Sequence, residues 1–129
     1  MITDPIGDLL IRLKNASSVG HTHVSVPFSA MKAAVAEVLA REGYVGEVKE
    51  KNKNSRALDI ELKYTNNRPA ISGTKRISKP SRRMYTGVHD IHPVKRGYGL
   101  LILSTPNGIL SGKEAKAKKV GGEILFEIW

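Results

Sequence analysis

The stretch that decides the fold is Leu58-Asp59-Ile60-Glu61-Leu62-Lys63, in which apolar residues alternate with charged ones. A period of two places successive side chains on opposite faces of a β-strand, so this stretch predicts a strand with one buried face. Upstream, Tyr44, Val45 and Val48 lead into the turn-rich Asn52-Lys53-Asn54-Ser55. The sequence therefore predicts two strands joined as a hairpin.

Two helices are predicted ahead of this hairpin. Asp4-Pro5, a capping residue followed by proline, predicts the start of the first helix. The apolar stripe of that helix consists of Ile6, Leu9, Leu10 and Leu13. Ser29 can cap the second helix and Gly43 can end it. Its expected buried stripe consists of Met31, Ala34, Val35, Val38 and Leu39.

A short strand with Val24, Val26 and Phe28 is predicted between the helices, and Pro27 favours a position near a sheet edge. The first half is therefore predicted as α-β-α-β-β.

The second half is predicted to be rich in β-strands. Polar turn residues at 65–69 mark the expected boundary between an α/β domain (residues 1–65) and a β-rich domain (residues 66–129). Candidate strands are residues 70–72, 83–86, 88–94, 99–103 and 123–129. Ser111-Gly112-Lys113-Glu114 has the pattern of a capping box and predicts a short helix through about Lys118. The expected fold class is α+β, in which the N-terminal domain packs against a β-rich C-terminal domain with one short helix, because each half alone buries a marginal core.

Composition favours an anionic partner. The 129 residues include 21 Lys and Arg against 12 Asp and Glu, which gives a net charge of +9. Such a charge attracts a polyanion, and nucleic acid fits better than a membrane because the sequence contains no basic amphipathic helix and no apolar run of about 20 residues. The chain has no cysteine and no secretion-type start, so we expect a cytoplasmic protein without disulfides or thiolate metal sites.

The positive charge is concentrated between Arg68 and Arg96. Eight basic residues and one acid, Asp90, give this segment a net charge of +7. These basic residues are interleaved with side chains that can bind phosphate and sugar oxygens or stack on a base, namely Ser72, Thr74, Ser78, Ser81 and Tyr85. The alternative is a solvated loop. Because almost all of the net charge lies in one β-rich half, we favour nucleic-acid binding.

An apolar run ends abruptly after Leu103. It is followed by Ser104-Thr105-Pro106-Asn107-Gly108, a cluster of small hydroxyl, amide and turn residues, and the apolar pattern resumes at Ile109. Short polar side chains on a tight turn can hydrogen-bond to a nucleic acid, and Gly108 allows close approach of the backbone. The alternative for the two hydroxyl residues is ordinary capping of the turn.

Matching stretches are spread in order along the whole chain. They are Asp4-Pro5-Ile6, Arg12-Leu13-Lys14-Asn15-Ala16, Glu42-Gly43-Tyr44, Ser78-Lys79-Pro80, Arg83-Met84-Tyr85, residues 97–110, Lys113-Glu114-Ala115 and residues 120–129. Together these stretches resemble the family of bacterial-type small-subunit ribosomal protein eight. Several separated matches in the same order are more specific than any single motif.

The resemblance implies a structural protein that is a primary binder of the central domain of small-subunit ribosomal RNA. Its binding would help this RNA domain to assemble into the subunit. Neighbouring small-subunit proteins are implied partners, and no catalytic residue, metal or cofactor is implied. In the family the serine-threonine turn contacts RNA, which maps onto Ser104, Thr105 and Gly108. The family usually has a second serine where this chain has Pro106, and the Asn107 amide can compensate in part. A further role implied by the family is repression of its own operon through a messenger hairpin.

We therefore predict an RNA-binding surface that contains the turn residues, Tyr85, Glu123 and five basic residues. Tyr85 would stack on an unpaired base, and packing in the core is its alternative. Glu123 would accept a hydrogen bond from a base amine, although a plain turn explains Gly121, Gly122 and Glu123 almost as well. The full predicted set is Ser104, Thr105, Asn107, Gly108, Tyr85, Glu123, Lys75, Arg76, Lys79, Arg82 and Arg83.

Three other classes of function are less favoured. Ser72 and Lys75 have the Ser-x-x-Lys spacing of some acyl-enzymes, but the sequence contains no companion motif. Two histidine pairs, His21 with His23 and His89 with His92, could each supply two metal ligands but have no obvious third. A DNA-binding architectural module is allowed by the charge, yet no predicted helix is rich in the Arg, Asn and Gln that recognise a major groove.

Overall fold

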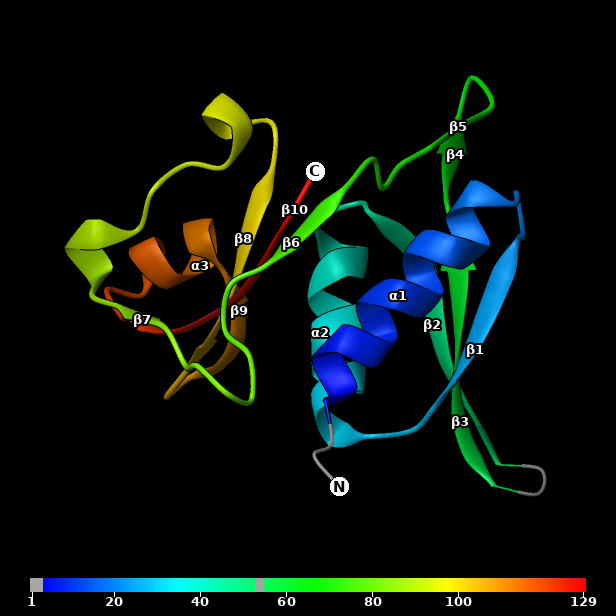
Figure 1. Ribbon diagram of the computed structural model, residues 1–129, viewed down its shortest axis with the longest axis horizontal. Helices are drawn as coiled ribbons and strands as arrows, with labels where there is room; N and C mark the ends of the chain where they lie inside the picture. The colour runs from blue at the N-terminus through cyan, green and yellow to red at the C-terminus, as the bar shows by residue number, and fades with distance from the viewer. Residues whose placement is uncertain (1–3, 53–54) are drawn as a thin grey trace. The chain divides into compact units, whose positions relative to one another are not determined.

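The central alternating stretch lies in the middle of a three-stranded antiparallel sheet with the order β1-β3-β2 (Figure 1). The computed structural model describes residues 4–52 and 55–129. The strands are β1 (His23–Pro27), β2 (Val45–Asn52) and β3 (Arg56–Leu62). In β3, Leu58, Ile60 and Leu62 are buried and Glu61 is exposed, which confirms the predicted alternation. The predicted hairpin of β2 and β3 is also confirmed, although its turn residues Lys53 and Asn54 lie outside the described residues.

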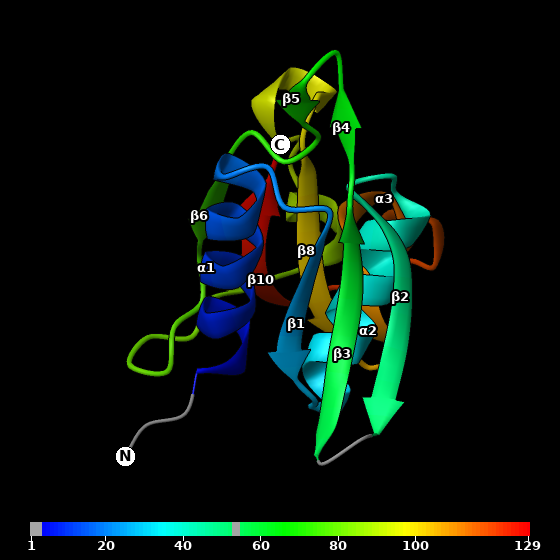
Figure 2. The same ribbon diagram turned by 90° about the vertical axis from the view of Figure 1, so that its right-hand side faces the viewer.

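Two helices cover one face of this sheet (Figures 1 and 2). Helix α1 (Pro5–Ser18) packs on β1, and α2 (Ala30–Arg41) packs on β2. The Ser29 hydroxyl accepts a hydrogen bond of 3.1 Å from the Lys32 amide, and Gly43 ends the helix with a φ of 85°. Strand β1 is an edge strand, as Pro27 indicated. Among the described residues, no helix has the length and apolar character needed to cross a bilayer.

The buried stripe of α2 differs from the prediction at two positions, because Lys32 and Ala36 are buried where Met31 and Ala34 were expected. Met31 was expected in the core but is 39% exposed, whereas Lys32 is only 6% exposed. The Lys32 ammonium donates to the Asp8 carboxylate at 2.9 Å and to the Pro27 carbonyl at 3.4 Å. A buried charge is tolerated where it is paired in this way. The hydrogen bond from Lys32, followed by one from Arg12, lowers the pKa of Asp8.

A second sheet forms around the C-terminal strand β10 (Gly122–Ile128). Its order is β6-β10-β8-β9, and β7 also pairs with β10, beyond the end of β6. The other strands are β6 (Thr74–Arg76), β7 (Tyr85–Thr86), β8 (Leu100–Thr105) and β9 (Gly108–Ser111). Helix α3 (Gly112–Ala117) begins with the predicted capping box of Ser111 and Glu114. The core beneath this helix is formed by Ile91, Val94, Leu101, Leu103, Leu110, Ala115 and Ile124.

The described residues divide into two compact units. Pro5–Ser72 form the N-terminal unit, and Asp4 with Gly73–Trp129 form the C-terminal unit. A small hairpin of β4 (Tyr64–Thr65) and β5 (Arg68–Pro69) belongs to the N-terminal unit and occupies the turn-rich stretch. The predicted division into domains of residues 1–65 and 66–129 stays a prediction.

Several predicted strands of the second half were wrong. Residues 70–72 do not form a strand, and 88–94 contain the 3₁₀ turn η1 (Val88–Asp90) and irregular chain, followed by η2 (Lys95–Gly97). The second error has a physical reason, since Pro93 lacks an amide donor and the buried residues Ile91 and Val94 are three positions apart. Only the end of the predicted strand 83–86 forms β7, and strand β8 extends two residues farther than predicted. Strands β6 and β9 were not predicted. The α+β class, with a β-rich C-terminal part and a short helix, is confirmed.

Candidate RNA-binding surface

Three predicted residues lie side by side across three strands. Tyr85 on β7 pairs with Glu123 on β10, and Glu123 pairs with Ser104 on β8. Residues directly opposite each other on antiparallel strands place their side chains on the same face of the sheet. We call these three residues the polar row. Tyr85 is 70% exposed, so its ring is available for stacking and does not belong to the core.

The turn after β8 is held by one hydroxyl group. Thr105 pairs with Gly108, and Pro106 and Asn107 form the two-residue loop between them. The Thr105 Oγ1 accepts a hydrogen bond of 3.1 Å from the backbone N–H of Asn107. The same hydroxyl donates a hydrogen bond of 2.8 Å to the backbone carbonyl of Gly108. The φ of Gly108 is 103°, which favours glycine. Thr105 therefore caps its own turn, and its hydroxyl retains only an acceptor site for another partner.

The Ser104 hydroxyl, unlike that of Thr105, is not used to hold the turn. Within residues 4–52 and 55–129, its hydroxyl makes no hydrogen bond. Its side chain is partly exposed on the same face as Glu123. Both the donor and the acceptor of this hydroxyl are therefore available to a ligand.

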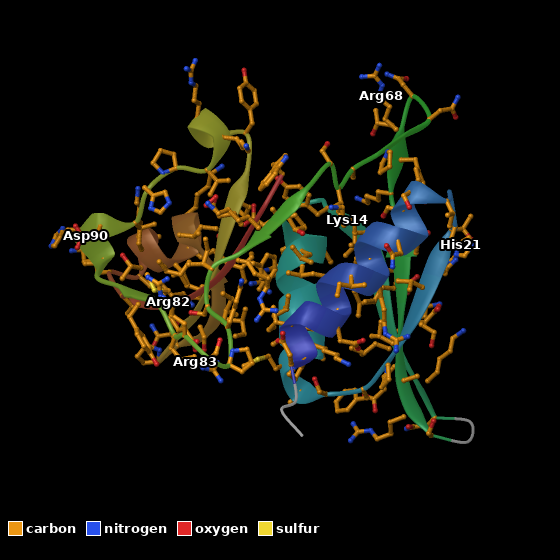
Figure 3. All side chains as sticks on the ribbon, in the orientation of Figure 1. Lys14, His21, Arg68, Arg82, Arg83 and Asp90 are labelled. Carbon is orange, nitrogen blue, oxygen red and sulfur yellow. The ribbon has the colours of Figure 1, made fainter. Side chains whose placement is uncertain are left out.

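A basic loop lies next to the polar row. We define it as residues 79–83, which include the exposed side chains of Lys79, Arg82 and Arg83. Figure 3 labels the two arginines. Its base is closed by Ser78, which is 2% exposed and whose hydroxyl accepts from the Met84 amide at 2.8 Å and donates to the Met84 carbonyl at 3.1 Å. Backbone hydrogen bonds from Ser78 to Ile124 and from Ile124 to Met84 fix the loop against β10. Ser78 was expected among the hydroxyls that bind phosphate, but it is buried and holds the loop instead.

One ion pair connects the basic loop to the polar row. Arg83 Nη1 lies 3.1 Å from Glu123 Oε2, and the side chains are 55% and 16% exposed. Because the Arg83 end of this pair is exposed to solvent, the guanidinium can also approach a phosphate while Glu123 stays in place. Glu123 also retains acceptor capacity, because a carboxylate offers about four lone-pair positions.

Two glycines allow the strands of the surface to approach closely. A Cβ atom on Gly122 would lie 2.1 Å from the Ser104 carbonyl oxygen, and one on Gly121 would lie 2.3 Å from the Thr86 carbonyl oxygen. Neither distance is possible for a real Cβ atom. The pair of glycines therefore lets β7 and β8 lie against the start of β10, which a plain turn would not require. In the sequence, this close approach is signalled by the Gly121-Gly122 dipeptide at the start of the last apolar stretch.

Two predicted residues lie apart from the polar row. The Arg76 guanidinium is 19% exposed, bonds to the Asp4 carboxylate at 2.7 Å, and donates twice to the Ser78 carbonyl. Arg76 thus has a structural role in the C-terminal unit. Lys75 is exposed but pairs with Glu127, four residues farther along β10 than Glu123. In the described part of the chain, no group of three or more His, Cys, Asp or Glu could hold a metal ion.

Comparison with known proteins identifies the family. The family model described as ribosomal protein S8 matches residues 4–129. The chain belongs to the ribosomal protein S8 family. It is 50% identical over 129 residues to a small ribosomal subunit protein uS8 from Desulfovibrio desulfuricans, with all of both chains covered. It is 46% identical to the uS8 protein of Persephonella marina, also over all of both chains, and 43% identical to that of Mycoplasma mobile, over 100% of this chain and 98% of the relative.

The departure of this S8 family member at Pro106 has a local explanation. Pro106 occupies the second position of the Thr105–Gly108 turn, where the fixed φ of proline suits a tight turn. A proline there removes one backbone donor but stiffens the hairpin that carries Ser104. Pro106 itself is not part of the polar row.

Proposed function

We propose that this chain is a structural protein of the small ribosomal subunit that binds the central domain of its ribosomal RNA. The proposal rests mainly on one observation, the placement of Tyr85, Glu123 and Ser104 on one face beside the basic loop. Membership in the S8 family supports the subunit and the kind of ligand. Neighbouring small-subunit proteins complete its surroundings in the cytoplasmic ribosome. The family is structural, and we expect the chain to have no catalytic activity.

The residues of the surface have different tasks in this proposal. The Ser104 hydroxyl donates to a base edge or a 2′-hydroxyl in the RNA minor groove, and Glu123 accepts from a base amine. Tyr85 stacks on an unpaired base, which is worth about 1–3 kcal/mol in single-stranded binding sites. Lys79, Arg82 and Arg83 bind the flanking phosphates, which supplies affinity without sequence specificity. Specificity then resides in the polar row.

The test compares an irregular RNA helix from the central domain with a fully paired DNA duplex of equal length. We expect tight, salt-dependent binding of the RNA and weaker binding of the DNA, because only the RNA offers 2′-hydroxyls and splayed bases. Filter binding at several salt concentrations measures both. Equal affinity for the two duplexes would contradict the proposal.

A single substitution tests the polar row. Ser104→Ala should weaken RNA binding about 2- to 10-fold, the loss expected for one hydrogen bond of roughly 0.5–1.5 kcal/mol. Ser25→Ala, at an exposed serine of β1 in the N-terminal unit, is the matched control and should bind like the parent protein. Thr105→Ala is less suitable, because it also removes the two hydrogen bonds that hold the turn. Unchanged binding by Ser104→Ala would remove this residue from the surface.

A further inference from the structure

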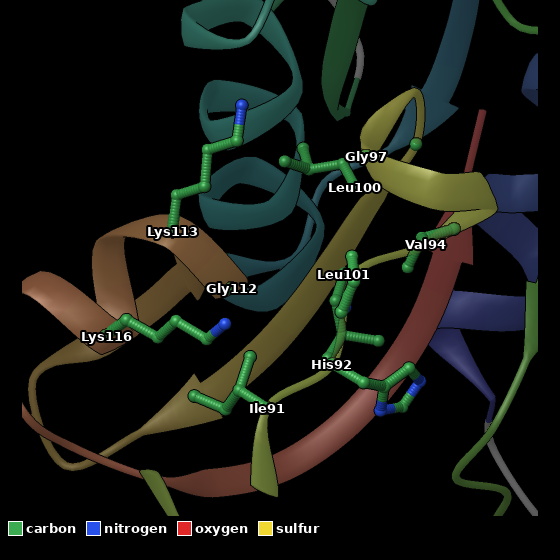
Figure 4. A pocket seen from close by; sticks show the side chains of 11 residues that line it. Ile91, His92, Val94, Gly97, Leu100, Leu101, Gly112, Lys113 and Lys116 are labelled. Carbon is green, nitrogen blue, oxygen red and sulfur yellow. The ribbon is translucent and has the colours of Figure 1, made fainter. Parts of the chain in front are cut away.

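A pocket of about 160 Å³ opens beside α3 in the C-terminal unit (Figure 4). Ile91, Val94 and Leu101 line it, and all three belong to the buried core of this unit. The rim carries the exposed side chains of Lys113 and Lys116 on α3. We call this feature the α3 pocket. It has an apolar floor and a positively charged rim, and none of its lining residues is in the proposed RNA-binding surface.

Glycines leave the pocket open. Gly97, Gly99 and Gly112 line it, so no side chain fills these positions. A Cβ atom on Gly112 would lie 3.3 Å from Ile91 Cγ2 and 3.4 Å from Leu101 Cβ, and one on Gly99 would lie 2.6 Å from Val94 Cγ1. An apolar cavity of roughly 150 Å³ is known to hold a benzene molecule, so the α3 pocket has room for one phenylalanine or leucine side chain.

The charges on the rim select the partner. Lys113 and Lys116 are three residues apart, so they are neighbours on the helix surface, and Figure 4 shows both side chains extending from α3 at the pocket. In the part of the chain that the structure describes, neither lysine has an ion-pair partner. The adjacent Glu114 carboxylate accepts a hydrogen bond from the Ser111 amide in the capping box. No acidic residue lines the described pocket, so a carboxylate from a partner would be attracted.

We propose that the α3 pocket receives one apolar side chain from an acidic segment of a neighbouring protein in the small subunit. This inference rests on the proposed function, because it takes the neighbour from the ribosome. RNA fits the pocket less well, since phosphates would satisfy the lysines but leave the Ile91, Val94 and Leu101 floor uncovered. A protein segment with one leucine or phenylalanine beside an aspartate or glutamate would cover the apolar floor with the first side chain and pair with the lysines of the rim through the second.

Photo-crosslinking in assembled subunits tests this inference. A photo-crosslinking amino acid replaces His92, which lines the pocket and is exposed. The protein is assembled into small subunits from purified components, irradiated, and analysed by mass spectrometry. We expect a crosslink to a protein peptide that has an acidic residue within a few positions of an apolar one. A crosslink to ribosomal RNA, or the absence of any crosslink in assembled subunits, would overturn the inference.

Charge reversal supplies the matched comparison. Lys116→Glu should lower the crosslink yield about tenfold, whereas Lys118→Glu makes the same charge change at an exposed residue outside the pocket and should leave the yield unchanged. Equal yields from the two variants would also overturn the inference. Sedimentation with the small subunit is measured separately. A protein that never enters the subunit contradicts the proposed function, whereas a protein that enters but gives no crosslink contradicts only the occupant of the pocket.

Discussion

Replacing Gly122 with alanine should destabilise the C-terminal unit by about 1–3 kcal/mol, the usual cost of forcing extra atoms into a packed site. The new Cβ would lie 2.1 Å from the Ser104 carbonyl oxygen, 2.9 Å from its carbon and 3.1 Å from Thr105 Cα. Because real Cβ atoms essentially never lie within 3.0 Å of such an atom, the β8 backbone has to move by roughly 1 Å. All three atoms belong to the backbone, so no side-chain rotation can relieve the contact.

Gly87→Ala is the control for this substitution. Gly87 has φ −82° and ψ 166°, which alanine adopts readily, and the nearest atom to its Cβ is Asp90 Oδ2 at 3.9 Å. We expect no loss of stability, or a gain of about 0.4–1 kcal/mol from the reduced freedom of the unfolded chain. The difference between the two variants then isolates the close approach of β10 to β8.

Urea unfolding followed by tryptophan fluorescence measures this difference. Trp129 is the only tryptophan, and it packs against the core of the C-terminal unit, so its emission reports on the unit that contains Gly122. Gly122→Ala should also weaken RNA binding, because the displaced backbone carries Ser104. A midpoint equal to that of Gly87→Ala would refute the claim that the strands need glycine at this position.

Three further predictions concern charged residues. Arg82→Ala should weaken binding to all RNA sequences alike and reduce the slope of log K against log salt by about 1, because it removes a phosphate contact. Arg76→Ala should instead lower the urea midpoint, since its guanidinium binds Asp4, and a normal midpoint would argue against that structural role. Asp8→Asn should cost about 1–3 kcal/mol at neutral pH by leaving the buried Lys32 ammonium without its carboxylate. The pKa of Asp8 is lowered by folding, so this contribution is present above the pKa of the unfolded carboxyl and is lost as the pH falls through the folded pKa. Acid titration of stability should therefore show the parent and the Asp8→Asn protein converging at low pH, and a constant gap would contradict the assignment.

The N-terminal unit was largely predictable because its signals are local. The alternation in β3 and the Ser29 cap each depend on residues within a few positions of one another. The burial of Lys32 was not predictable in this way, since its carboxylate partner Asp8 lies 24 positions away. The buried position at this end of α2 is therefore occupied by Lys32, which is paired with Asp8, and Met31 is exposed.

The candidate surface was predictable in its residues but not in its arrangement. Ser104, Glu123 and Tyr85 were each named from the sequence, yet their adjacency depends on the register of β10 against β7 and β8, which no local pattern encodes. The separate roles of Ser104 and Thr105 depend in the same way on hydrogen bonds that appear only in the folded turn. Arg76 stays a predicted RNA-binding residue, and its ion pair with Asp4 was not predictable, because a basic residue that binds phosphate and one that binds a carboxylate look alike in a sequence.

The position of β10 also bears on how the chain is made. During translation β6, β7 and β8 are all synthesised before Gly122, yet each of them pairs with β10. A nascent chain that stops before this strand lacks Glu123 and the partner that joins β7 to β8, so the polar row is not assembled. Under the proposed function, only polypeptides translated through β10 would then compete for the RNA.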